Sequence, residues 1–281
     1  MQQVFSYRAN KILFDFIQSN NLQGKIILPA NICHDVVETL WYAGCILHFV
    51  DIDAHTLCMD WKQALPLVKD ACVILFVHTY GVEDDYSVIF DAARKENPKI
   101  AIVDDRCLCF PILDFMQTNA DLVLFSTGEK KQVDLGEGGI GYVADGWKYE
   151  RIEVPESLAL KNKTWIPNKC EIRKRMDEVI LHKKKLNFIY RNNLAKHVLC
   201  LPDSYQHWRF NIVVPNKTEV LQTIFDAGLY ASSHYAAQGE NCSVAMNLSA
   251  RVVNLFNDFY YTEGQAQKTC DVILEVMQQK K

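Results

Sequence analysis

Short apolar runs recur along the first half of the chain, and their spacing constrains the fold more than any other feature. They are KIILPA from Lys25, ILHFVDID from Ile46, ACVILFVHTYG from Ala71, KIAIVDD from Lys99, ADLVLFST from Ala120 and GGIGYVAD from Gly138. Nearly continuous Val, Ile and Leu content is typical of strands that are buried on both faces, as in a parallel sheet covered by helices. Segments between the runs, such as residues 36–42 and 88–93, have helical periodicity. We therefore predict a large, doubly wound α/β domain with a mostly parallel sheet.

The last third of the chain has a different pattern, which predicts a smaller second domain. A polar stretch around residues 161–169 contains Pro167 and follows Pro155, and both prolines break regular structure. Beyond it, the spacing predicts a long helix over about 171–196, a strand in RFNIVVP from Arg209, a helix over 217–227 closed by Gly228, and a helix over 263–279. We predict a large domain over residues 1–160, followed by a linker helix and a small α+β domain over 161–281.

Composition narrows the range of partners. The formal net charge is −4 and the basic residues are scattered, so no stripe could neutralise a nucleic-acid backbone. No stretch approaches the roughly 20 apolar residues of a membrane span, and the first residues do not resemble a signal peptide. We expect a cytoplasmic protein without nucleic-acid or membrane partners.

The ten cysteines are better read as reduced and mostly buried thiols than as a disulfide scaffold, because they are spread through apolar runs of a long chain. Cys107 and Cys109 form the one close pair, and no second pair stands at zinc spacing. Packing is therefore favoured over a metal site, and we predict none.

Three apolar runs end in polar residues, and ligands of open α/β sheets bind beyond the carboxyl ends of the strands. The endings are VHTYG (77–81), IVDD (102–105) and LFSTGEKKQVDLGEGG (124–139). Taken singly, Asp105 could cap a helix, His78 could be a hydrogen-bonded core histidine and Lys131 could be a solvated loop lysine. Together, the three endings place a carboxylate, a hydroxyl, a lysine and a glycine cluster at one edge of the sheet.

That combination suits pyridoxal phosphate. The cofactor needs a lysine amine for a Schiff base, a carboxylate at the ring nitrogen, and hydroxyl and backbone donors for its phosphate. Lys131 can supply the amine, and an ionised Asp105 would favour the protonated ring nitrogen. The glycines of GEGG allow the backbone to turn tightly beside a cofactor.

The segment FSTGEKKQVDLGEGGIGYV resembles the signature of the DegT/DnrJ/EryC1/StrS family of pyridoxal-phosphate-dependent sugar aminotransferases. The resemblance implies that Ser126 binds the phosphate and that Lys131 is the Schiff-base lysine, with Lys130 out of register. It also implies a fold type I transferase, in which Asp105 pairs with the pyridine nitrogen. The resemblance extends weakly over nearly all of the chain, but only the lysine segment is specific.

Further cofactor contacts follow from the same resemblance. Ser6, Tyr7 and Arg8 stand where the family has a phosphate-binding turn at a helix N-terminus, a place that suits an anion. Cys33 stands where an aromatic ring usually stacks on the cofactor, and the neighbouring His34 could serve instead.

The sequence departs from the family pattern at several points. Leu108 replaces a glutamine that usually contacts the cofactor, and Tyr7 replaces a glycine of the phosphate turn. The chain starts almost at that turn, so we expect it to lack the family's N-terminal arm.

The leading functional hypothesis is an aminotransferase that moves an amino group from an amino acid to a keto sugar, which is expected to be nucleotide-linked. A homodimer is expected, since related sites are built at a subunit boundary. Two alternatives stay open: a pyridoxal-phosphate-dependent lyase or aldolase acting on an amino acid, since fold and cofactor do not fix the chemistry, or a noncatalytic degenerate paralogue.

Overall fold

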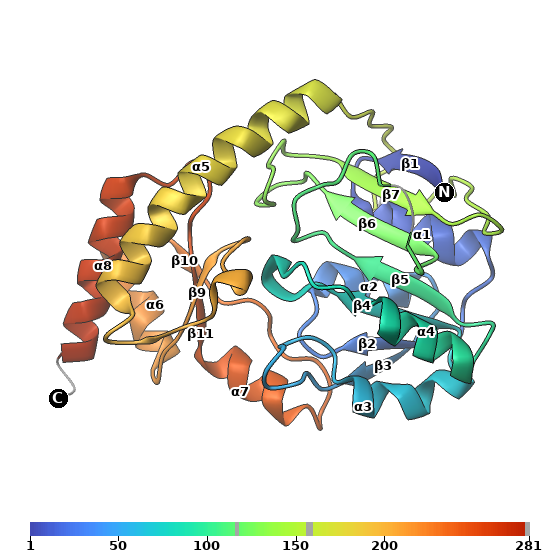
Figure 1. The fold of residues 1–281 in the computed structure, drawn as a ribbon, viewed down its shortest axis with the longest axis horizontal. Coiled ribbons are helices and arrows are strands. Elements are labelled where there is room, and N and C mark those ends of the chain that lie inside the picture. Colours follow the sequence, from blue (N-terminus) through green and yellow to red (C-terminus); the bar gives the residue numbers. More distant parts are fainter. Residues whose placement is uncertain (116–117, 156–159, 279–281) are drawn as a thin grey trace.

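A computed structural model describes residues 1–115, 118–155 and 160–278 and shows two sheets (Figure 1). The large sheet has the strand order β1-β7-β6-β5-β4-β2-β3. Its strands are β1 (Gln2–Ser6), β2 (Lys25–Pro29), β3 (Ile46–Val50), β4 (Val73–Val77), β5 (Ala101–Asp105), β6 (Leu122–Ser126) and β7 (Gly139–Val143). Strands β3, β2, β4, β5 and β6 are parallel, whereas β7 is antiparallel to both β6 and β1. The six predicted strands and the mostly parallel sheet are confirmed, and β1 was not predicted.

Helices cover both faces of this sheet, which confirms the doubly wound α/β class. On one face lie α1 (Ala9–Ser19) and α2 (His34–Tyr42), packed against residues such as Ile26 and Leu28 of β2. On the other face lie α3 (Trp61–Ala64), the short 3-10 helix η1 (Leu65–Asp70) and α4 (Ser87–Glu96), where Ile27 of the same strand is buried. Every residue of β4, β5, β6 and β7 is buried, which explains their nearly unbroken apolar sequences.

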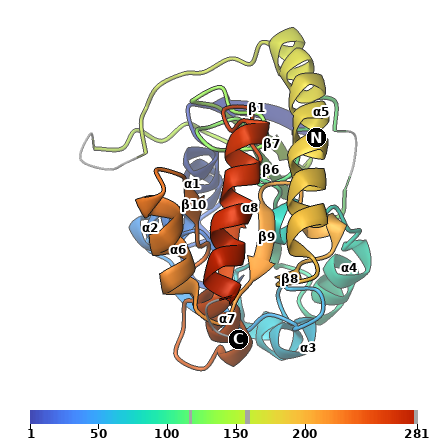
Figure 2. The same cartoon turned by 90° about the vertical axis from the view of Figure 1, so that its left-hand side faces the viewer.

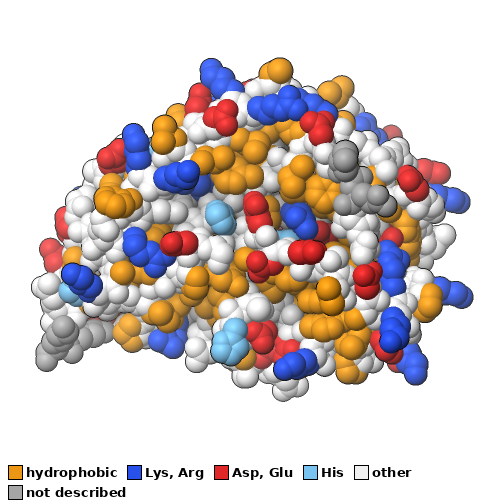
Figure 3. Space-filling model, viewed as in Figure 1, with side chains coloured by type: hydrophobic (Ala, Val, Ile, Leu, Met, Phe, Trp, Pro, Cys, Tyr) orange, Lys and Arg blue, Asp and Glu red, His pale blue; other side chains and the backbone are white. Residues whose placement is uncertain are grey.

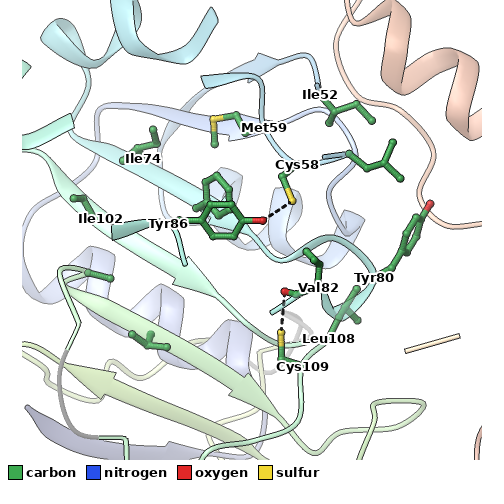
Figure 4. Packing of buried hydrophobic residues seen from close by; sticks show 14 of the residues in the cluster. Ile52, Cys58, Met59, Ile74, Tyr80, Val82, Tyr86, Ile102, Leu108 and Cys109 are labelled. Carbon is green, nitrogen blue, oxygen red and sulfur yellow. Dashed lines mark hydrogen bonds between the residues drawn. The ribbon is translucent and has the colours of Figure 1, made fainter. Parts of the chain in front are cut away.

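Cys58 and Cys109 are buried in the core beside β4 and β5 (Figure 4). The Cys58 thiol lies 3.3 Å from the Tyr86 hydroxyl, and the Cys109 thiol donates to the Val82 carbonyl over 3.8 Å. All ten cysteines are free thiols, and Cys170 is the exposed one among them. Cys109 thus packs in the core, as the sequence analysis predicted for the Cys107 and Cys109 pair.

The smaller sheet is antiparallel and has the order β10-β11-β9-β8. Its strands are β8 (Leu199–Cys200), β9 (Phe210–Val213), β10 (Ala231–Ser232) and β11 (Val252–Leu255), and the helices around it are α5 (Lys169–Leu194), α6 (Lys217–Asp226), α7 (Ser243–Arg251) and α8 (Glu263–Gln278). Figure 2 shows α8 between α5 and α6. The predicted helices α5, α6 and α8 and strand β9 are confirmed, although residue 279 lies outside the described residues. The other strands and α7 were not predicted.

Helix α5 connects the two sheets. Near its start, Lys169 and Arg173 each form an ion pair of 2.9 Å with Asp114 of the large part. Toward its end, Leu186 and Tyr190 are buried in the core of the small sheet. The proposed domain boundary after residue 160 falls between the sheets. No helix of the described residues combines the length and apolar character needed to cross a membrane.

Candidate active site

A cavity of about 490 Å³ opens at the carboxyl ends of three parallel strands. Its wall includes Val77, Asp105 and Ser126, which are the last residues of β4, β5 and β6. In Figure 3, acidic, basic and histidine side chains gather near the middle of the face that is shown. The three strand endings singled out in the sequence therefore meet at one edge, as expected for an open α/β sheet.

Lys131 lines this cavity from the loop that joins β6 to β7. The loop is closed by hydrogen bonds from the Thr127 amide to the Gly138 carbonyl and from the Leu135 amide to the Thr127 carbonyl, each 2.9 Å long. Within the described residues, no carboxylate forms an ion pair with the Lys131 amine, whereas the neighbouring Lys130 ammonium lies 3.5 Å from Glu129. Lys131 thus lines the cavity without a counter-ion from the part of the chain that the structure describes.

Asp105 lines the same cavity and is almost fully buried. Its Oδ1 atom accepts a hydrogen bond from the Cys107 amide over 2.9 Å, which fixes the carboxylate. Because successive strand residues point to opposite faces, the adjacent Asp104 faces away from it, and its two oxygens lie 2.7 Å from His78 Nε2 and 2.7 Å from Arg106 Nε. The two neighbouring aspartates therefore occupy separate sites.

The Asp104 pair explains the role of His78. Burial raises the pKa of the Asp104 carboxyl, but its hydrogen bonds and ion pairs with His78 and Arg106 outweigh burial and lower the pKa overall. His78 Nδ1 also lies 2.7 Å from the Val82 carbonyl oxygen, and His78 is not among the residues that line the cavity. His78 is thus a hydrogen-bonded core histidine, which was the structural alternative in the sequence analysis.

One end of the cavity is suited to an anion. Arg8, Ala9 and Asn10 line it where α1 begins, and that helix has neither a capping side chain nor an acidic residue in its first turn. The first-turn N–H groups of a helix lack partners within the helix and carry partial positive charge. Ser126 lines the same cavity, and its hydroxyl donates to the Gly138 carbonyl over 3.3 Å and accepts from the Gly128 amide over 3.2 Å.

The glycines of the cluster differ in what surrounds them. A Cβ atom on Gly139 would lie 2.4 Å from the Ala9 nitrogen, and one on Gly138 would lie 2.1 Å from the Thr127 hydroxyl. These two glycines make room for protein neighbours. Gly136, which has a φ of +76° and no atom within 4 Å of an added Cβ, is the member of the cluster that lines the cavity.

The structure does not place every predicted cofactor residue at the cavity. Ser6 ends β1 and is buried, and the Tyr7 ring lies 5.1 and 4.8 Å from the ammonium groups of Lys161 and Lys163. His34 begins α2 with a side chain that is 69% exposed. None of Ser6, Tyr7 and His34 lines the cavity, whereas Arg8, Asp105, Ser126 and Lys131 do.

Two departures from the family pattern also lie in the cavity wall. Cys33 and Leu108 both line it, and so does Cys107. Burial raises the pKa of the Cys33 and Cys107 thiols, so both are largely protonated at neutral pH. The wall at these positions is apolar or only weakly polar, because none of the three offers a strong hydrogen-bonding group.

The small sheet supplies a wall that the sequence analysis missed. It consists of Trp208, Arg209, Ala231, Ser232, His234, Tyr235 and Phe256. The Trp208 ring is nearly parallel to that of Tyr235, and its indole Nε1 donates to the Lys130 carbonyl over 2.9 Å. This bond ties the small sheet to the loop of Lys131. The residues come from separate strands and loops and share no local motif, so no sequence signal marked them.

His234 in this wall is a neutral group at physiological pH. Burial lowers the pKa of its imidazole, and the positive charges of Arg209, Lys131 and Lys130 lower it further. A neutral imidazole adds a donor and an acceptor to the cavity without adding charge. In the part of the chain that the structure describes, no group of three potential metal ligands occurs.

Solved structures with this fold include several aminotransferases. One is a DegT/DnrJ/EryC1/StrS aminotransferase from Brucella abortus, with a TM-score of 0.76 and 15% identity over 99% of this chain and 86% of that one. Another, described as a sugar aminotransferase from Streptococcus pneumoniae in its PLP form, has a TM-score of 0.79 and 15% identity over 99% and 87%. A third, DesI in the presence of its TDP-sugar product, has a TM-score of 0.78 and 17% identity over 99% and 81%. At such identities the likeness shows the fold alone.

The family is established by the sequence. No curated protein matches the chain significantly. The sequence model of the DegT/DnrJ/EryC1/StrS aminotransferase family, however, matches residues 9–180, which is more than half of the chain and includes Asp105, Ser126 and Lys131. The chain therefore belongs to the DegT/DnrJ/EryC1/StrS aminotransferase family.

Proposed function

We propose that this family member transfers an amino group from an amino acid to a keto sugar, with pyridoxal phosphate as cofactor and Lys131 as the catalytic residue. The observation that carries the proposal is the shared cavity, which is lined by the amine of Lys131, the carboxylate of Asp105, the hydroxyl of Ser126 and the start of α1. The solved relatives in PLP and PMP forms support the cofactor. DesI, solved with a TDP-sugar product, supports a nucleotide-linked sugar.

The donor set at the cavity fits the cofactor. Lys131 would hold it covalently through Nζ, and Asp105 would hold the proton on its ring nitrogen by opposite charge. Ser126 and the uncapped start of α1 would bind its phosphate, because a helix N-terminus without a cap attracts an anion. Bound pyridoxal phosphate supplies an aldehyde that takes up and releases an amino group, and a ring that withdraws electrons.

The protein's own part is to position these groups and to move a proton. The Lys131 amine has no protein counter-ion in the described residues, so Nζ is available to carry a proton to and from the reacting substrate carbon. The bond between Trp208 and the Lys130 carbonyl holds the loop in place. Together with Tyr235, Trp208 also covers the cavity on the side of the small sheet, which limits the access of water.

Borohydride reduction in the presence of pyridoxal phosphate tests the central residue. Wild-type protein should absorb visible light with the cofactor, and reduction should trap an adduct that mass spectrometry maps to Lys131. Lys131→Ala should form no adduct, while the matched control Lys130→Ala should still form one on Lys131. An adduct mapped to Lys130, or no adduct in the wild type, would contradict the proposal.

The substrate class needs a second assay. Amino acids are screened for conversion of the loaded protein to the pyridoxamine form, followed by nucleotide-linked and free keto sugars as acceptors. Transfer to a keto sugar supports the proposal, and cleavage of the amino acid's carbon skeleton would instead identify a lyase or aldolase. We also propose that the protein is cytoplasmic and forms a homodimer. Sedimentation at micromolar concentration tests the dimer.

A further inference from the structure

Arg209 lines the cavity of Lys131 and has hydrogen-bond donors without acceptors. It lies directly before β9, and its side chain is 2% exposed. The Nε and Nη1 atoms are shielded from solvent and have no hydrogen-bond partner, while Nη2 is not among the shielded nitrogens. A guanidinium carries five N–H donors and stays charged in proteins, so a buried one with several donors unused is costly. A ligand with acceptor oxygens would remove part of that cost.

The guanidinium is held firmly in place. Its central carbon lies 4.1 Å from the centre of the Phe256 ring and 5.0 Å from that of the Trp208 ring, and both rings line the cavity. Asp258 Oδ2 lies 3.1 Å from Nη1 and compensates part of the charge. A charged fork fixed between two aromatic rings binds an oxyanion with little loss of side-chain entropy.

The nearest other buried cation does not compete for a ligand. Burial and the charge of Arg209 lower the pKa of the Lys183 ammonium well below its usual value. Its Nζ donates to the Trp208 carbonyl over 3.1 Å and to Asn257 Oδ1 over 2.8 Å, and Lys183 does not line the cavity. Arg209 is therefore the small sheet's charged donor to the cavity.

Charges beyond Arg209 favour a small monoanion over a diphosphate. A second cavity of about 720 Å³ adjoins the first, sharing Glu129, Lys130, Gly136 and Phe256 with it. Its charged lining residues are the acids Glu129, Asp134, Glu171 and Asp258 and the bases Lys130 and Arg175. An excess of acids on this side disfavours a diphosphate next to Arg209, whereas a single carboxylate matches the one partly compensated charge of Arg209.

We propose that Arg209 binds the α-carboxylate of the amino-acid donor and so holds the donor in place. The inference rests on the proposed function, because it assigns the other end of a substrate whose amino group reacts near Lys131. The planar guanidinium can offer two N–H groups to the two oxygens of a carboxylate. Arg209 makes no covalent bond in this role, and its effect is on donor binding.

The test compares the two half-reactions separately in the loaded enzyme. Arg209→Gln should raise the KM for L-glutamate about 10- to 100-fold, as expected for the loss of a charge-assisted pair, and should leave the KM for the keto sugar within about twofold. Arg191→Gln is the matched control, because Arg191 also lies over an aromatic ring and pairs with an aspartate but does not line the cavity. A larger effect on the sugar half-reaction would assign Arg209 to a sugar phosphate and overturn the inference.

Two further measurements do not depend on how well Arg209 variants fold. Asp258→Asn removes the competing carboxylate and should lower the KM for L-glutamate about threefold or more. Wild-type enzyme should discriminate about 10- to 100-fold against L-isoglutamine, which has an amide in place of the α-carboxylate. Equal use of both donors, or a higher KM in Asp258→Asn, would overturn the inference.

The outcomes also separate this inference from the function on which it rests. If wild-type protein forms the Lys131 adduct and accepts glutamate, but Arg209→Gln and Asp258→Asn leave its KM unchanged, only the role of Arg209 is wrong. If wild-type protein forms no adduct, the proposed function fails and the role of Arg209 fails with it.

Discussion

Replacing Gly139 by alanine is expected to disturb the anion end of the cavity from a position that does not line it. The added Cβ would lie 2.4 Å from the nitrogen and 2.6 Å from the Cα of Ala9, and 2.5 Å from the carbonyl carbon of Arg8. Ordinary contact begins near 3.4 Å, so the backbone at the start of α1 must move by about 1 Å. No rotamer can relieve this clash, because all three atoms belong to the backbone.

The cost follows from that displacement. Overpacking costs about 1–3 kcal/mol, and the lower backbone entropy of alanine in the unfolded chain offsets about 0.5–1 kcal/mol. We expect a net loss of about 1 kcal/mol, or a decrease in Tm of about 2–4 °C. Moving the start of α1 should also weaken pyridoxal phosphate binding by about tenfold or more, since misplacement by 1 Å is expensive at such sites.

Thermal unfolding and a cofactor titration followed by absorbance check the two effects. Gly264→Ala is the control: this glycine lies in the first turn of α8, and an added Cβ would meet nothing within 4 Å. Its Tm should stay the same or rise, because alanine favours a helix. If Gly139→Ala lowered the Tm but kept the cofactor affinity of the wild type, the assignment of α1 to the phosphate would be wrong, and an unchanged Tm would contradict the clash itself.

Three further changes test other parts of the structure. Asp104→Asn should lower the free energy of unfolding by about 3–5 kcal/mol at pH 7, because it breaks a buried pair with His78. Since the folded-state pKa of Asp104 is lowered, the stabilisation by this carboxylate is lost as the pH falls through that pKa. Urea unfolding should therefore show the difference in stability between wild type and variant narrowing below about pH 4. Trp208→Phe keeps an aromatic ring but removes the hydrogen bond to the Lys130 carbonyl. It should lower the free energy of unfolding in urea by about 1 kcal/mol and slow the trapping of the cofactor on Lys131 by borohydride. An unchanged trapping rate would contradict the positioning role of Trp208. A thiol reagent should label the exposed Cys170 first in the native protein and the five buried cysteines only after unfolding, which peptide mapping checks; the buried ones are Cys45, Cys58, Cys109, Cys242 and Cys270.

The large sheet was predictable because its strands carry their own signal. Strands β4, β5 and β6 are buried on both faces, so their sequences are apolar throughout, and their last residues necessarily meet at one edge. For that reason the sequence alone predicts that Asp105, Ser126 and Lys131 share one site. Strand β1 was not predicted, because QQVFS is short and only partly buried at the edge of the sheet.

The wall from the small sheet could not be predicted in the same way. Arg209 and Phe256 are 47 positions apart in the sequence, and only tertiary folding brings the guanidinium over the ring. In the sequence, RFNIVVP reads as an ordinary strand with a basic residue at its start. The contacts of Gly138 and Gly139 with protein neighbours could not be predicted either, because a glycine that makes room for a ligand and one that makes room for another part of the protein look alike in the sequence.

The antiparallel pairing of β6 and β7 has a consequence for the reactive amine. In a parallel sheet the chain leaves a strand through a crossover of a dozen residues or more and returns from the opposite edge. Here Ser126 and Gly139 are direct partners across the ladder, so both ends of the intervening segment are anchored side by side. Because both ends of the loop are fixed, the Lys131 amine can reach only a small volume above the sheet. Folding of the β6–β7 hairpin therefore positions the amine before a ligand binds.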